Sequence, residues 1–121
     1  MESKYKILVV DDEEVILNLI EAVLSNKSYI VTKTNNSEEA MVLISLNKYD
    51  LMITDLDMPI FNGFEIIAKV RKINPGTAII LISGSLIEKV PKFITFLQKP
   101  FDINNLISVV KEEFKKKLNV N

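Results

Sequence analysis

The chain has 121 residues, of which 48% are hydrophobic and 26% are charged, and this balance is typical of a single globular domain over residues 1–121. A net charge of −1 argues against a nucleic-acid-binding surface. No apolar stretch is long enough to cross a membrane and no basic-then-apolar leader opens the chain, so we expect a cytoplasmic protein. Cysteine and histidine are both absent, which excludes thiol chemistry, a serine–histidine–aspartate triad and thiolate or imidazole metal ligands.

Short apolar runs alternate with helical patterns along the chain. The runs are rich in β-branched or aromatic residues and predict strands at residues 5–10, 29–32, 51–54, 78–82 and 93–97. Apolar residues at helical spacing predict helices around residues 15–24, 40–44, 64–70 and 103–114, and Asp102 is placed to cap the last of them. This alternation predicts an α/β fold: a doubly wound, five-stranded parallel sheet with helices on both faces.

The segment between Ser83 and Lys99 departs from the alternation. It has fifteen residues, GSLIEKVPKFITFLQ, and the last five or six belong to the predicted fifth strand. Pro91 interrupts the part that precedes this strand. The sequence therefore predicts that the fourth helix is short, irregular or absent.

Reactive side chains stand where four of the five apolar runs end. Asp11 and Asp12 follow the first run, Asp55 the third, Ser83 the fourth and Lys99 the fifth. Ligands of doubly wound sheets bind beyond the carboxyl ends of the strands. If the strands are parallel, three carboxylates, a hydroxyl and an ammonium meet at one edge of the sheet.

Each of these residues alone also has an ordinary structural interpretation. Asp11 or Asp12 would cap the following helix, Asp55 would be a polar strand end, Ser83 a turn hydroxyl and Lys99 a surface charge. Together, three carboxylates with no histidine or arginine among them repel one another unless a cation compensates. Oxygen ligands suit a hard cation such as Mg²⁺.

Four motifs, in this order and between elements of the right type, carry a family resemblance. They are VVDDEE after the first run, TDLDMPIFNG after the third, LISGS at the end of the fourth and FLQKPF at the end of the fifth. With them the chain resembles a response-regulator receiver domain, the phosphoacceptor module of two-component signalling, over nearly its whole length. The resemblance implies a flavodoxin-like sheet with strand order 2-1-3-4-5.

The resemblance also implies a chemical role for each matched position. Asp55 would accept a phosphoryl group from a phosphohistidine on a sensor histidine kinase or a histidine phosphotransfer protein. Mg²⁺ would be held by Asp11, Asp12, Asp55 and the backbone carbonyl of Asp57, and we expect Asp12 to touch the ion directly and Asp11 to act through water. Lys99 would pair with Asp55 and then with a phosphate oxygen.

Further matched positions concern the switch and the loops. Ser83 would move to bond the phosphoryl group and Phe96 would turn inward with it, although plain core packing is the alternative for Phe96. Four residues would shape the loops: Pro59, Gly63 through a conformation that other residues resist, Gly84 by keeping the phosphoryl group accessible, and Pro100 through a cis bond after Lys99. Asp57 and Ser85 would influence the lifetime of the acyl phosphate, in a direction that we do not predict.

A domain of this kind would be a signalling switch rather than an enzyme, acting on an unknown downstream effector and contacting neither nucleic acid nor membrane. Three alternatives remain. A degenerate receiver would serve only as a protein-interaction module, a small aspartyl-phosphate phosphatase would use Asp55-Leu56-Asp57, and a flavodoxin-like protein would bind a flavin phosphate, which the acidic first loop disfavours. Because the fourth helix is disrupted, we also expect dimerisation through residues 86–98 and the last helix to be impaired.

Overall fold

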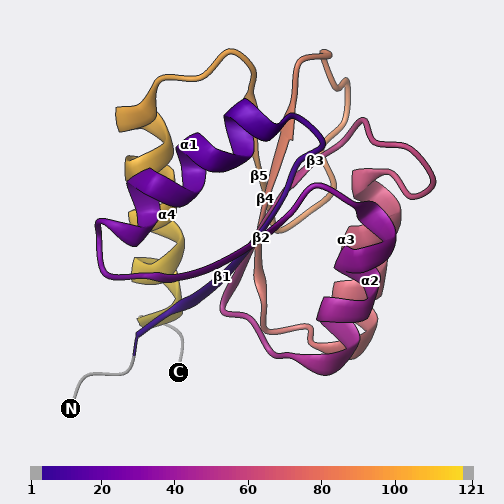
Figure 1. Cartoon of the computed structure of the whole chain (residues 1–121), viewed down its shortest axis with the longest axis horizontal. Helices are drawn as coiled ribbons and strands as arrows, with labels where there is room; N and C mark the ends of the chain where they lie inside the picture. The colour runs from indigo at the N-terminus through magenta and orange to yellow at the C-terminus, as the bar shows by residue number, and fades with distance from the viewer. Residues whose placement is uncertain (1–3, 119–121) are drawn as a thin grey trace.

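The computed structural model describes residues 4–118 and contains one parallel sheet. Its strands are β1 (Lys6–Val10), β2 (Ile30–Thr34), β3 (Leu51–Asp55), β4 (Ala78–Ser83) and β5 (Ile94–Gln98). The helices are α1 (Glu14–Ser25), α2 (Ser37–Leu46), α3 (Gly63–Ile73) and α4 (Ile103–Leu118). The strand order is β2-β1-β3-β4-β5, which confirms the doubly wound, flavodoxin-like fold (Figure 1).

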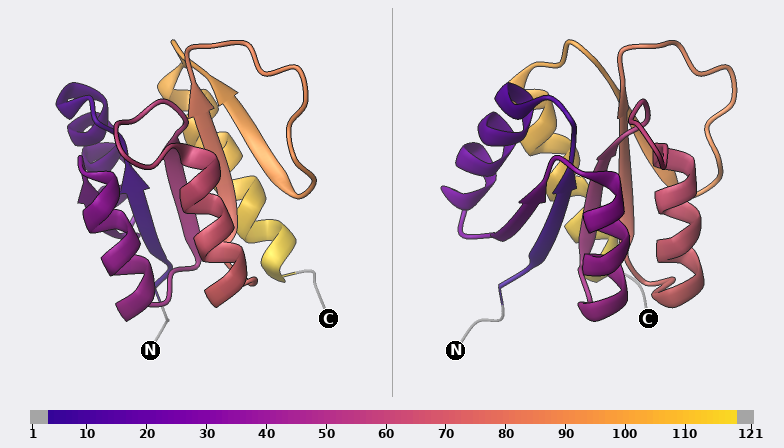
Figure 2. Two further views of the ribbon diagram at one scale, coloured as in Figure 1. Left: turned by 90° about the vertical axis from the view of Figure 1, so that its right-hand side faces the viewer. Right: turned by 45° about the vertical axis from the view of Figure 1, so that its right-hand side comes forward.

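The helices form two layers, one on each face of the sheet (Figures 1 and 2). Alternate residues of β1 point to opposite faces, so Ile7 and Val9 join a core with α1 and α4, whereas Leu8 and Val10 join a core with α2 and α3. Because both faces are covered, the central strands are apolar throughout instead of alternating. The two cores hold the strand ends rigidly in register.

Side-chain caps set the start of three helices. Asn62 and Glu65 form a capping box at α3, and the Asn36 side chain accepts the Glu39 N–H at the start of α2. Asp102 accepts the Asn104 N–H at 2.7 Å just before α4, as the sequence predicted. No helix within residues 4–118 combines the length and the apolar character that crossing a bilayer requires.

The connection between β4 and β5 has no helix in residues 84–93, all of which the structure describes. It crosses as an extended loop on the side of α3 (Figure 2). The Arg71 side chain on α3 donates a hydrogen bond to the Lys92 carbonyl and tethers the loop just before Phe93, which is exposed and has a positive φ of 66°. The sequence left a short or irregular helix open here; the structure shows that the helix is absent.

Candidate functional site: an acidic cluster at the carboxyl ends of the strands

Three carboxylates meet where β1 and β3 end. These strands are hydrogen-bonded neighbours, with Val10 opposite Thr54, so Asp11 and Asp55 leave the sheet side by side. Asp11, Asp12 and Asp55 each place a carboxylate oxygen so that all three atoms lie within 4.8 Å of one another. Asp11 and Asp55 are buried and Asp12 is exposed. The structure therefore brings together the three acids that the sequence predicted at this edge.

Lys99 reaches the same cluster from the end of β5. Its Nζ lies 3.0 Å from Asp11 Oδ2, 3.6 Å from Asp55 Oδ2 and 2.7 Å from Glu13 Oε1. The Lys99 backbone N–H donates to the Ser83 carbonyl at 2.8 Å, which fixes the lysine beside the end of β4. The bond between Lys99 and Pro100 is cis, as the family resemblance implied. Strand pairing thus delivers the ammonium to the acids.

The cluster holds more negative charge than Lys99 neutralises. Burial, followed by the nearby Asp11 charge, raises the pKa of Asp55 from 3.8 to about 7, although Lys99 opposes this shift. Burial also raises the pKa of Asp11. For Lys99, burial lowers the pKa, but the hydrogen bonds to Glu13 and Asp11 outweigh it and the pKa is raised overall. A bound cation would relieve the repulsion among these acids.

Ser83 is fully buried at the end of β4, and its hydroxyl makes its hydrogen bonds to residues other than Asp55. It donates to Asp57 Oδ2 at 3.4 Å and accepts the Ser85 N–H at 3.0 Å. Phe96 is half-buried and packs against the core formed with α2 and α3. Ser83 therefore lies beside Lys99 at the end of β4 and Phe96 lies within β5, and their movement as a switch stays a prediction.

The loop after β3 corrects one expectation about Gly63. Gly63 does not have a positive φ; glycine is needed there because a Cβ would meet the Asp55 carbonyl oxygen at 2.6 Å and Leu56 Cα at 2.9 Å. The positive φ, 73°, belongs to Ile60, where the Phe61 N–H donates to the Pro59 carbonyl at 2.9 Å. The sequence-based expectation placed the unusual backbone conformation at glycine, the residue type that most often adopts it, whereas the structure places it at Ile60.

The Pro59 turn is also tied to α2. The Ser37 hydroxyl donates to the Pro59 carbonyl at 2.7 Å and accepts the Phe61 N–H at 3.2 Å. Gly84, by contrast, is exposed and open, since the nearest atom to a Cβ built there is Lys99 Cβ at 4.0 Å. Pro59 therefore shapes its loop through its carbonyl, and Gly84 leaves space beside Lys99.

Sequence reasoning missed Glu13 as a residue of the site. It occupies the N-cap position of α1, which neither Asp11 nor Asp12 takes, and its N–H donates to Asp11 Oδ1 at 2.9 Å. Its side chain makes the shortest contact to Lys99. The signal was present in the sequence, because Glu13 directly follows the acidic pair at the same strand end that Lys99 was predicted to reach.

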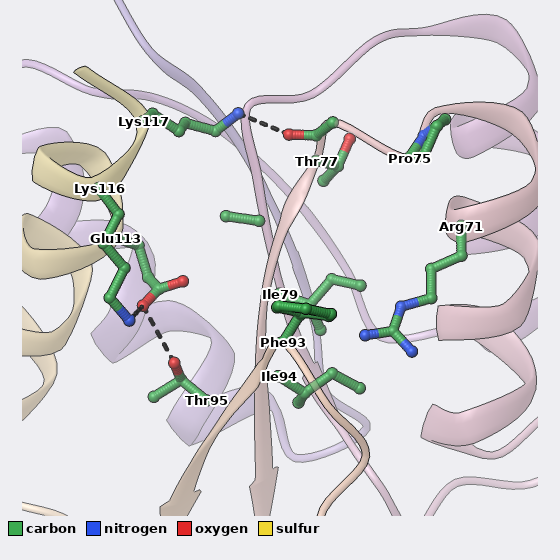
Figure 3. A pocket seen from close by; sticks show the side chains of 12 residues that line it. Arg71, Pro75, Thr77, Ile79, Phe93, Ile94, Thr95, Glu113, Lys116 and Lys117 are labelled. Atoms are coloured by element: carbon green, nitrogen blue, oxygen red, sulfur yellow. Dashed lines mark hydrogen bonds and ion pairs between the residues drawn. The ribbon is translucent and has the colours of Figure 1, made fainter. Parts of the chain in front are cut away.

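A separate cavity lies away from the acidic cluster (Figure 3). It measures about 580 Å³ and is found where β4 and β5 begin, between Arg71 of α3 and the Glu113–Lys116 ion pair of α4. It contains none of the predicted site residues. Phe93, at the end of the helix-free connection between β4 and β5, is among its lining residues, and the cavity is not part of the acidic cluster.

Comparisons with known proteins bear on the family. The family model described as the response regulator receiver domain matches residues 7–111. The DNA-binding transcriptional regulator NtrC of Azospirillum brasilense is 34% identical over 114 residues, which are 89% of this chain and 24% of that protein. The autoinducer 1 sensor kinase/phosphatase LuxN of Vibrio campbellii is 31% identical over 109 residues, which are 86% of this chain and 13% of that protein.

A solved structure agrees. The receiver domain of the hybrid histidine kinase CckA superposes with a TM-score of 0.80 at 31% identity, covering 89% of this chain and 97% of that one. The chain thus corresponds to a small part of LuxN and of NtrC and to nearly all of an isolated receiver domain. With the family model matched over most of its length, this chain belongs to the response regulator receiver domain family of two-component signalling.

Proposed function

We propose that residues 1–121 form one receiver domain that works as a phosphoacceptor switch, with Asp55 taking a phosphoryl group from a phosphohistidine of a sensor histidine kinase or a histidine phosphotransfer protein. The observation that carries this proposal is the setting of Asp55. Its buried carboxylate lies beside those of Asp11 and Asp12, and the Lys99 ammonium is 3.6 Å away. A nucleophile beside an acidic cluster that could bind a cation and beside an anchored ammonium suits the transfer of an anionic group.

The donor set fits Mg²⁺. Asp11 Oδ2 is buried and, among the described residues, has no hydrogen-bond partner, although it faces Lys99 as an ion pair at 3.0 Å. Burial, followed by the nearby Asp11 charge, raises the pKa of Asp55, and a bound cation would favour its ionised form. Asp11, Asp12, Asp55 and the backbone carbonyl of Asp57 would hold the ion, with Asp11 acting through water. When bound, Mg²⁺ supplies positive charge that offsets repulsion between the carboxylates and the transferring oxygens.

The chain's own residues make the bond. A carboxylate oxygen of Asp55 attacks the phosphorus, a new P–O bond forms, and the P–N bond to the donor imidazole breaks, after which the imidazole takes a proton from solvent. Lys99 pairs with one phosphoryl oxygen and the Ser83 hydroxyl donates to another. To do so, Ser83 gives up its contact with Asp57, and Phe96 follows into the space that Ser83 leaves. That rearrangement would be the signal read by an effector.

The proposal is tested by phosphorylation with a small donor. We expect incubation with phosphoramidate and Mg²⁺ to add one phosphoryl group, seen by intact mass, and Asp55→Asn or chelation of the metal to abolish it. Asp50→Asn is the matched control, because Asp50 lies at the opposite end of β3, where its carboxylate accepts the Lys6 N–H. Equal phosphorylation of Asp55→Asn, or no effect of chelation, would contradict the proposal. A wild type that gains no phosphoryl group would favour a module that only binds proteins.

A further inference from the structure

The Lys99 ammonium is not centred on Asp55. It lies 2.7 Å from Glu13 Oε1 and 3.6 Å from Asp55 Oδ2, so its closest partner is an acid that the proposed phosphoryl transfer does not use. Lys99 is largely buried, with 14% of its side chain exposed, whereas the Glu13 side chain is 61% exposed. The ammonium is therefore shared between the exposed Glu13 and the buried Asp11, whose Oδ2 is 3.0 Å away, and both are closer to it than the proposed phosphoacceptor.

The backbone fixes Glu13 in this place. Glu13 directly precedes α1, and its N–H is held by Asp11 Oδ1 at 2.9 Å. Lys99 is held by its own N–H at the end of β4. With both main chains anchored, the two side chains can meet without ordering either loop, which lowers the entropic cost of the ion pair.

We propose that Glu13 is a positioning residue that competes with the phosphoryl group for Lys99. In the unphosphorylated chain Glu13 holds the ammonium; when Asp55 carries a phosphoryl group, the ammonium moves toward it and the contact with Glu13 weakens. Glu13 therefore favours the unphosphorylated form. This inference rests on the proposed function of Asp55 and adds a specific contact that opposes phosphorylation.

Glu14 provides a matched control. It is the next residue and carries the same charge, but its carboxylate accepts a hydrogen bond from the Asn35 side chain and has no contact with Lys99. Glu13→Gln and Glu14→Gln remove equal charge from the same turn. Any difference between them isolates the contact with Lys99 from the general effect of charge on binding an anion.

The test uses beryllofluoride, a phosphoryl analogue, titrated into the chain with Mg²⁺ by calorimetry. We expect Glu13→Gln to bind it about threefold to fivefold more tightly than Glu14→Gln, as suits a partly exposed ion pair. In a Lys99→Met background the difference should vanish. Without metal or beryllofluoride, the Lys99 side-chain NMR resonance should shift in Glu13→Gln and stay in place in Glu14→Gln.

The outcomes separate the two claims. If wild type and Glu14→Gln bind beryllofluoride but Glu13→Gln binds equally or more weakly, Glu13 does not compete and the inference is overturned while the proposed function stands. A difference that persists without Lys99 overturns it too. If no variant with Asp55 intact binds beryllofluoride or accepts phosphate, the proposed function fails and the inference falls with it.

Discussion

Two connections of the same kind are built very differently in this molecule. One joins β3 to β4 and the other joins β4 to β5, and each begins directly after a predicted site residue, Asp55 or Ser83. The first contains α3, an eleven-residue helix with a capping box. The second has no helix in residues 84–93. Yet the site residues that precede the two connections, Asp55 and Ser83, lie at the same edge of the sheet.

The difference shows what positions the site. Strand pairing places Asp55 opposite Ile82 and Ser83 opposite Gln98, and the Lys99 N–H bonds the Ser83 carbonyl at 2.8 Å. These contacts involve the ends of the strands and are the same whether or not a helix lies behind them. The helix of the first connection instead stabilises the loop and the core that it covers.

The largest effect is expected at Gly63, in the connection between β3 and β4. Gly63→Ala would push a methyl group against the Asp55 carbonyl oxygen at 2.6 Å and Leu56 Cα at 2.9 Å, both backbone atoms that cannot move aside cheaply. We expect a loss of about 3 kcal/mol in the free energy of unfolding, measured by urea denaturation.

Gly84→Ala is the control in the helix-free connection. Its methyl group would meet nothing closer than Lys99 Cβ at 4.0 Å, so we expect a change of less than about 0.5 kcal/mol. Similar losses for the two variants would mean that the loop after β3 relaxes around the methyl group and that close packing does not select Gly63.

A second prediction concerns Asp55 and Ser83, the residues that directly precede the two connections. It compares how replacing each one changes the pH dependence of stability. Because burial raises the pKa of Asp55 from 3.8 to about 7, the folded chain retains a proton there that the unfolded chain has lost. This contribution to stability is complete below pH 3.8 and is lost as the pH rises through about 7. Asparagine cannot ionise, so Asp55→Asn should avoid the loss.

Without divalent metal, we expect Asp55→Asn to exceed the wild type in unfolding free energy by about 2 kcal/mol at about pH 8, and by much less at about pH 5. Ser83→Ala loses the acceptor of the Ser85 N–H and should cost about 1 kcal/mol at both pH values. Denaturant titrations in a chelator measure all three chains. An Asp55→Asn difference independent of pH would contradict the raised pKa.

Much of this fold could be predicted from the sequence because parallel strands covered on both faces are apolar throughout, and helices with one covered face repeat at their own period. The acids and Lys99 could be placed at one edge for the same reason. Strand boundaries were off by one or two residues: β2, expected at 29–32, is Ile30–Thr34.

What could not be predicted depends on side-chain direction and close approach. The Ser83 hydroxyl faces Asp57, and Glu13 reaches Lys99 across 86 positions of sequence. The sequence-based expectation was that glycine is needed at position 63 for its backbone conformation. The structure shows that glycine is needed because neighbouring backbone atoms leave no room for a Cβ. Such contacts arise only after strands pair; for Glu13 the sequence indicates its place after the acidic pair, whereas no local pattern encodes the contacts of Ser83 and Gly63.

The smallest effect concerns the cap that only the first connection has. Asn62→Ala removes the acceptor of the Glu65 N–H and half of the capping box at α3, and should lower the unfolding free energy by about 1 kcal/mol. Glu88→Ala, at an exposed site of the second connection, has no helix to uncap and should stay within about 0.5 kcal/mol. Amide exchange should quicken in the first turn of α3 for Asn62→Ala alone.

If strand pairing positions the site, phosphorylation of Asp55 in Asn62→Ala should remain within about twofold of the wild type once the protein is folded, since the change of about 1 kcal/mol acts on a helix start. The Gly63 N–H would still bond the Leu56 carbonyl at 2.8 Å, and Ser37 would still hold Pro59, so the loop keeps two anchors. A much larger loss of phosphorylation would show that the α3 cap positions Asp55, and that the helix-free connection after Ser83 needs another source of rigidity.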